Sequence, residues 1–220
     1  MFSTNTWRFL KSLGAARFFI GVAALVTMAA PALGQTFANG QYCTFTQGGW
    51  GAVPRGNNPG MLLYKNFSNV YPSGVEVGTG FSMQFTSPDA VMNYLPAGGK
   101  PKALTGDLIN PTSSPSGVFG GQVLALELNV DFSAAGVVPS GVGDLILAGT
   151  NTSFDGLSVR NILDMANQAL GGGVLFDSTL NDLVSLLNQG FDNCYPSGWV
   201  QDHLTPSSSG GDDGGGIPVG

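Results

Sequence analysis

Beyond the first 34 residues, the longest continuous apolar stretch covers residues 116–135, and its only charged residues are Glu127 and Asp131. Leaving a large apolar side chain in water costs about 1.5–3 kcal/mol, so we expect this stretch to lie at the centre of the core. From Leu124 to Phe132 apolar residues alternate with smaller or polar ones, which is typical of a strand. The same residues also fit the faces of a fully buried helix, so periodicity leaves helix and strand open.

Four further segments have the apolar spacing of helices, and each follows a side chain that can accept a hydrogen bond from the first turn. The expected caps and helices are Asn58 with residues 59–70, Ser87 with residues 88–95, Asp155 with residues 156–170, and Ser178 with residues 179–191. Alternation over residues 75–85 predicts one strand or a hairpin broken at residues 78–80, and residues 41–47 predict a short strand. These patterns indicate a helix-rich α+β fold with a small antiparallel component.

The two ends of the chain differ in composition from the segment between them. Residues 1–34 have the basic start, apolar run and small residues of a secretory signal, with cleavage expected before Gln35 or after Ala32. An uncleaved N-terminal anchor is the alternative. Residues 206–220 are rich in Ser, Gly and Asp and are expected to form a disordered tail. Residues 35–205 are then long enough for one globular module.

The net charge of the chain limits the classes of partner that it can bind. The chain has 14 acidic and 8 basic residues and a net charge of −6, and all of its acids follow residue 34. An acidic protein lacks the basic face that binds nucleic acid or anionic lipid. We therefore expect no nucleic-acid partner. The apolar run of residues 18–30 is too short for a comfortable membrane span, so we expect no span in the mature chain. The signal indicates a secreted or extracellular location.

The chain contains two cysteines, Cys43 near the expected mature start and Cys194 near the end of the expected module. In an exported protein, two such cysteines are expected to form a disulfide, which would join the first and last elements of the module. Two buried thiols are the alternative.

Candidates for catalysis are sparse. The single histidine, His203, lies at the edge of the tail, and the sequence offers no cluster of zinc ligands. Glu127 and Asp131 lie one turn apart if their segment is a helix, where they mark either its wetter edge or the acid pair of a hydrolase. Residues 151–156 resemble the start of a calcium loop, but Ile162 stands where the loop needs a bidentate Glu. We expect no catalytic residue, metal or cofactor.

Two tryptophans, Trp50 and Trp199, flank the cysteines. Aromatic faces with polar neighbours can form a ligand surface, for example one that stacks on sugars. Packing over the disulfide explains the same positions, and the sequence favours that interpretation.

Residues 43–51 (Cys-Thr-Phe-Thr-Gln-Gly-Gly-Trp-Gly) resemble the opening of modules in secreted and cell-surface bacterial proteins that begin Cys-Thr-x-Thr-Gln-Gly-x-Trp. Residues 95–99 with 104–105, and residues 121–130 with their Leu-Asn-Val end, are similar to later parts of those modules, so the resemblance spans residues 43–194. It implies an extracellular or surface protein, often beside adhesion-type domains, with no known activity or ligand. It also implies that the Leu-Asn-Val segment is helical.

With this resemblance, the expected fold is a helix-rich α+β single domain around a buried central helix. The expected function is that of a secreted, non-enzymatic extracellular or cell-surface module, structural or adhesion-type, whose unknown partner is a glycan or a surface protein. A carbohydrate- or calcium-dependent binding protein is the first alternative, and a carboxylate-based hydrolase is the second.

Overall fold

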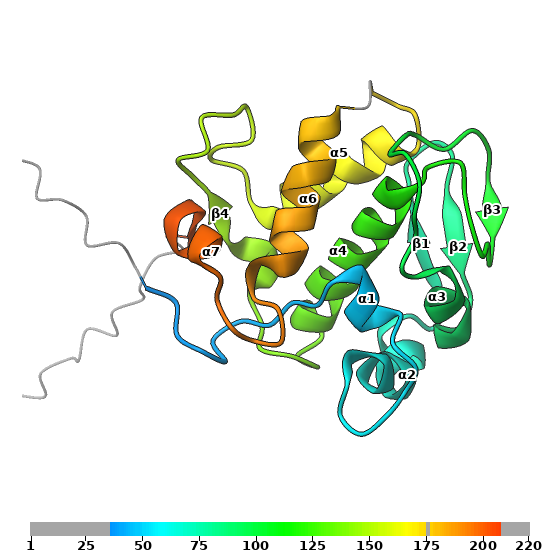
Figure 1. Ribbon diagram of the computed structural model, residues 1–220, viewed down its shortest axis with the longest axis horizontal. Coiled ribbons are helices and arrows are strands. Elements are labelled where there is room, and N and C mark those ends of the chain that lie inside the picture. Colours follow the sequence, from blue (N-terminus) through cyan, green and yellow to red (C-terminus); the bar gives the residue numbers. More distant parts are fainter. Residues whose placement is uncertain (1–35, 175–176, 208–220) are drawn as a thin grey trace, which may run out of the picture. The chain divides into compact units, whose positions relative to one another are not determined.

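The computed structural model describes residues 36–174 and 177–207 (Figure 1). The predicted signal over residues 1–34 lies outside the described residues, and so does the predicted tail from residue 208 onward. The described residues form a helix-rich α+β fold, as predicted. Within the described ranges, no helix has both the length and the hydropathy that crossing a membrane requires.

The central apolar segment is helix α4, Val118–Ala134, which confirms the helical alternative. Figure 1 shows it running between helices α5 (Val159–Leu170) and α6 (Ser178–Gly190) on one side and the three-stranded sheet over residues 75–109 on the other. It packs on α5, α6, α1 (Gln47–Trp50), the 3-10 turn η1 (Val142–Asp144) and β1 (Val75–Val77). Because the helix is buried on all sides, its sequence shows no single apolar stripe, and this produced the ambiguity with a strand.

A glycine lets α1 approach α4 closely. A Cβ atom on Gly121 would lie 1.9 Å from Gln47 Oε1, so no larger residue fits without moving the Gln47 side chain. Gln47 Oε1 in turn accepts a hydrogen bond of 3.0 Å from the backbone N–H of Ala97. The motif around Gln47 therefore joins the start of the module to α4 and to the loop after α3 (Pro88–Tyr94).

The amide of Asn129, on α4, is a fully buried polar group that is only 1% exposed. Its Oδ1 accepts hydrogen bonds from Phe45 N (2.8 Å) and from Trp50 Nε1 (3.1 Å). Its Nδ2 donates to Phe45 O and to Asn188 Oδ1, both at 2.9 Å. One side chain thus satisfies groups of the N-terminal segment, of α1 and of α6, with all its donors and acceptors inside the core.

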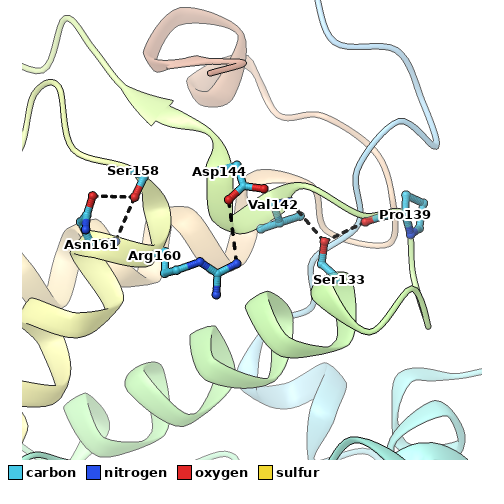
Figure 2. Close-up of polar contacts among 7 residues, drawn as sticks. All are labelled: Ser133, Pro139, Val142, Asp144, Ser158, Arg160 and Asn161. Atoms are coloured by element: carbon cyan, nitrogen blue, oxygen red, sulfur yellow. Dashed lines mark hydrogen bonds and ion pairs between the residues drawn. The ribbon is translucent and has the colours of Figure 1, made fainter. Parts of the chain in front are cut away.

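The predicted helix starts are correct at two positions and displaced at two. Asn58 and Ser87 cap α2 (Pro59–Val70) and α3 as predicted. Helix α5 begins later than predicted, because Ser158 rather than Asp155 accepts the hydrogen bond from the first turn, at Asn161 N (Figure 2). Helix α6 begins one residue earlier than predicted, because Asp177 rather than Ser178 is its cap.

The strands form two small sheets. In the first, β1 pairs antiparallel with β2 (Met83–Phe85), which confirms the hairpin, and β3 (Leu108–Ile109) joins β2 in parallel. In the second, β4 (Ile146–Leu147) pairs antiparallel with β5 (Leu204–Thr205). The strand predicted over residues 41–47 is wrong: Thr44 makes a single bridge with Asp192, and the chain then turns into α1.

At the C-terminal end of α4, Ser133 fixes the return of the chain. Its hydroxyl donates to Pro139 O at 2.9 Å and accepts from Val142 N at 3.2 Å (Figure 2). Both contacts hold η1 against the helix end, and η1 leads directly into β4.

The predicted disulfide joins Cys43 to Cys194 across 151 residues of sequence. Backbone pairing brings the two cysteines together, since Thr44 N donates to Phe191 O at 3.0 Å and Asn193 N donates to Thr44 O at 3.2 Å. Gly40 N also donates to Cys194 O at 2.8 Å. The first and last segments of the module are therefore held side by side by covalent and hydrogen bonds.

The Asn129 network yields a stability prediction. Asn129→Ala leaves Phe45 N, Trp50 Nε1 and Asn188 Oδ1 without the partner that satisfies them, and each buried unsatisfied group costs about 1–3 kcal/mol. We expect the free energy of unfolding to fall by about 3 kcal/mol or more in urea denaturation. Asn161→Ala, at an exposed position of α5, is the matched control and should cost under about 1 kcal/mol. Equal losses in the two variants would contradict the network's role.

Candidate functional site

A groove lies where three segments meet: the loop after β4, helix α6, and helix α7 (Gly198–His203). It encloses about 200 Å³. Half of its lining side chains are apolar, and the other half, three threonines and one aspartate, form what we call its polar rim. The lining residues are Thr150, Thr152, Phe154, Thr179, Asp182, Leu183, Leu186 and Trp199.

Hydrogen bonds hold α7, and with it Trp199, in place. Ser197 caps the helix and donates its N–H to Gly190 O, at the end of α6, at 2.8 Å. Ala148 N donates to His203 O at 2.9 Å, where β4 and β5 pair. The amide of Gln201 exchanges two hydrogen bonds with the backbone of Phe37. Helix α7 is therefore tied to three separate parts of the chain.

Trp199 is half-buried, and its ring packs against His203 with centroids 5.3 Å apart. Trp50 differs entirely: it is 0% exposed, and its ring packs on Phe45 and Phe132. The interpretation of Trp50 as part of a ligand surface is therefore wrong, because this side chain belongs to the core. Trp199 lines the groove and stays a candidate.

The loop residues that resemble the start of a calcium site form a hydrogen-bonded turn. Asp155 accepts from Thr150 N at 3.1 Å, from Asn151 N at 2.9 Å, and from the Thr150 hydroxyl. The hydrogen bond from that hydroxyl lowers the pKa of Asp155. Its carboxylate is thus occupied in shaping the rim of the groove. In the part of the chain that the structure describes, no three His, Cys, Asp or Glu side chains are arranged to hold a metal.

The acid pair predicted on the central segment lies half-buried at the edge of α4 that faces α5. Glu127 Oε2 accepts a 2.9 Å hydrogen bond from Asn167 Nδ2 of α5. Burial raises the pKa of Glu127 to about 7; Asp131 and Asp164 add to the increase, while the bond from Asn167 and the charge of Arg160 oppose it. At neutral pH this carboxyl is therefore divided between its protonated and ionised forms.

Tyr71 and Arg160 complete this cluster. Burial raises the pKa of Asp131 as well, whereas the nearby Tyr71 hydroxyl and the charge of Arg160 lower it. The Tyr71 hydroxyl is buried and close to Asp131, yet the two do not meet hydrogen-bond geometry. Arg160 extends from the first turn of α5 toward Asp144, with the closest N and O atoms 3.9 Å apart (Figure 2). Both side chains are largely exposed, so this ion pair contributes little stability.

Sequence reasoning named Trp199 but missed the rest of the groove. One feature of the sequence could have indicated the groove. The predicted apolar stripe of α6 runs through Leu183, Leu187 and Phe191, and Leu186 lies outside it, on the otherwise polar face. Leu186 is 37% exposed and lines the groove instead of the core. The contribution of Thr150 and Phe154 depends on the pairing of β4 with β5, which joins segments far apart in sequence.

The chain was compared with models of protein families, with curated proteins and with solved structures, and nothing matches it. The resemblance to modules that begin Cys-Thr-x-Thr-Gln-Gly-x-Trp therefore stays a prediction.

The raised pKa of Glu127 predicts a pH-dependent stability. Its folded pKa of about 7 lies above the ordinary value of 4.5, so the folded state holds the proton more tightly than the unfolded state. The stabilisation is complete below about pH 4.5 and is lost as the pH rises through about 7. We expect Glu127→Gln to reduce the loss of stability between pH 5 and pH 8, measured by urea denaturation at both pH values. Glu76→Gln, at an exposed position of β1, should leave the wild-type dependence unchanged.

If the wild-type protein and Glu127→Gln lost the same free energy of unfolding between these pH values, the assigned titration would be wrong. Thermal denaturation at pH 5 and pH 8 gives an independent measure of the same difference.

Proposed function

We propose that this protein is a secreted, non-enzymatic extracellular module that acts by binding a partner at its surface. The observation that carries the proposal is the disulfide between Cys43 and Cys194, which closes the described fold from its first segment to its last. Disulfides of this kind persist in oxidising compartments outside the cytoplasm. The signal-like first 34 residues and the acidic composition support the same location.

The arrangement of ionisable groups supports binding rather than catalysis. The acids with a raised pKa, Glu127 and Asp131, belong to a cluster at the α4–α5 contact, where Asn167 ties Glu127 to α5. His203 packs on Trp199 and contacts Ala148 O through Nδ1, so it has a positional role at the groove. The groove itself combines apolar side chains with a few polar ones, as binding sites generally do.

Expression of the full chain in a Gram-negative bacterial host tests whether the protein is secreted. We expect a mature N-terminus at Gln35, or two residues earlier, in the periplasm or the medium. Non-reducing mass spectrometry should find Cys43 and Cys194 resistant to alkylation and the protein two hydrogen atoms lighter than its reduced form. A chain from which residues 1–34 are deleted is the control and should stay in the cytoplasm. Full-length protein with free thiols in the cytoplasm would contradict the proposal.

The disulfide should also contribute a large part of the free energy of unfolding of the secreted form. In the chain-entropy description, closing a loop of 151 residues stabilises the folded state by about 4–5 kcal/mol. We expect the double variant Cys43→Ala and Cys194→Ala to lose about this free energy of unfolding, measured by urea denaturation. A loss below about 1 kcal/mol would contradict this contribution and would show that the hydrogen bonds at Gly40 and Thr44 suffice to hold the two segments together.

A further inference from the structure

The segments that form the groove are uniformly acidic. The loop over residues 146–158, helix α6 with its cap, and helix α7 contain Asp155, Asp177, Asp182 and Asp202 but no Lys or Arg. Asp182 lines the groove and is exposed to solvent. Asp155 and Asp177 accept hydrogen bonds from Thr150 and Thr179, two of the residues that line the groove. A largely apolar groove with one carboxylate in its lining and two more bonded to its threonines is complementary to a cation that carries an apolar stem.

The size of the groove limits what can enter it. At about 200 Å³ it is smaller than the roughly 300–1,000 Å³ pockets that enclose small-molecule ligands. It therefore suits one side chain of a partner protein better than a whole cofactor or an oligomeric ligand. Leu183 and Leu186 of α6 and Phe154 of the loop after β4 line the groove and supply apolar contact for such a side chain.

Trp199 selects among cationic side chains. Its ring is half-buried at the groove, and tryptophan is the aromatic residue that attracts cations most strongly over its face. Arginine stacks its planar guanidinium on aromatic rings and forms paired hydrogen bonds with carboxylates, whereas lysine has a compact and strongly hydrated charge. Trp199 and Asp182 line the same groove and offer both kinds of contact.

We infer that this groove is a docking site for an arginine side chain of an extracellular partner protein. The guanidinium lies between Trp199 and Asp182, and the aliphatic stem packs on Leu186. The inference rests on the proposed function, since it names the chemistry of the partner that a binding module would take. Charge complementarity favours this occupant over a neutral sugar, which would not use the charge of Asp182.

The test uses the purified, disulfide-bonded protein and three short peptides: acetyl-Leu-Arg-Leu-amide, the same peptide with uncharged citrulline, and the same peptide with Glu. Binding is followed through the indole N–H signals in proton–nitrogen NMR spectra. Trp50 is 0% exposed and donates to Asn129, so its signal serves as an internal control. At pH 8, where histidine side chains are ordinarily neutral, the Arg peptide should shift the Trp199 signal and leave the Trp50 signal in place.

Variants then separate charge from general apolar contact. Asp182→Asn should weaken binding of the Arg peptide about three- to tenfold, and raising the salt from 20 to 300 mM should weaken it further. Asp89→Asn removes the same charge from an exposed position of α3 and should leave the affinity unchanged. Trp199→Leu keeps an apolar residue at the groove and should lower the affinity at least tenfold. Because this variant lacks the Trp199 indole, its affinity is measured by isothermal titration calorimetry, with the wild-type protein titrated in the same way.

Three outcomes would overturn the inference. The first is equal binding of the Arg and citrulline peptides. The second is a Trp199 signal that no peptide shifts at millimolar concentration. The third is a shift produced by methyl β-glucopyranoside and unaffected by Asp182→Asn, which would identify a sugar site instead. None of these outcomes depends on whether the protein is exported. A failure of the docking proposal can therefore be distinguished from a failure of the proposed secreted function.

Discussion

Helix α4 is buried along nearly its whole surface, and that burial constrains everything around it. A helix in this position can carry polar side chains only where neighbouring segments satisfy them, because an unpaired buried polar group costs more than a hydrogen bond contributes. Asn129 meets this condition by bonding the N-terminal segment, α1 and α6 at once. The module's first element and its late helix are thereby fixed relative to the same point of the core.

At the half-buried edge of α4, polar side chains also need partners from neighbouring segments, although less strictly than in the core. Glu127 is held by Asn167, whose own Oδ1 accepts from Gly78 N at 2.8 Å and whose backbone O accepts from Thr79 N at 2.9 Å. These bonds connect α4, α5 and the turn between β1 and β2. Glu127, whose pKa burial raises to about 7, thus takes part in the contact between the helices and the sheet, so its protonation bears on stability and on the pH dependence of stability.

The sequence could predict what depends on local chemistry. The caps at Asn58 and Ser87, the broken hairpin and the pairing of the two cysteines follow from residue types and their spacing. It could not predict what depends on tertiary packing. Asp155 looked like a helix cap, but the loop after β4 engages its carboxylate with Thr150, and Ser158 caps the helix instead. For Trp50 the sequence left a ligand surface and packing over the disulfide as alternatives, whereas its ring packs on Phe45 and Phe132 in the core and its indole N–H donates to Asn129.

The disulfide helps to fix the position of α7, the helix that carries Trp199 into the groove. Cys194 anchors the chain just before α7, and the pairing of β5 with β4 anchors it just after, so Trp199 lies on a short helix fixed at both ends. Val200, 0% exposed, adds a third attachment against Gly190 at the end of α6. A ring held in this way loses little conformational freedom when a partner binds, which preserves affinity that a flexible surface would lose on ordering. The bond that suits the protein to an oxidising environment therefore also pre-organises the surface through which we propose it acts.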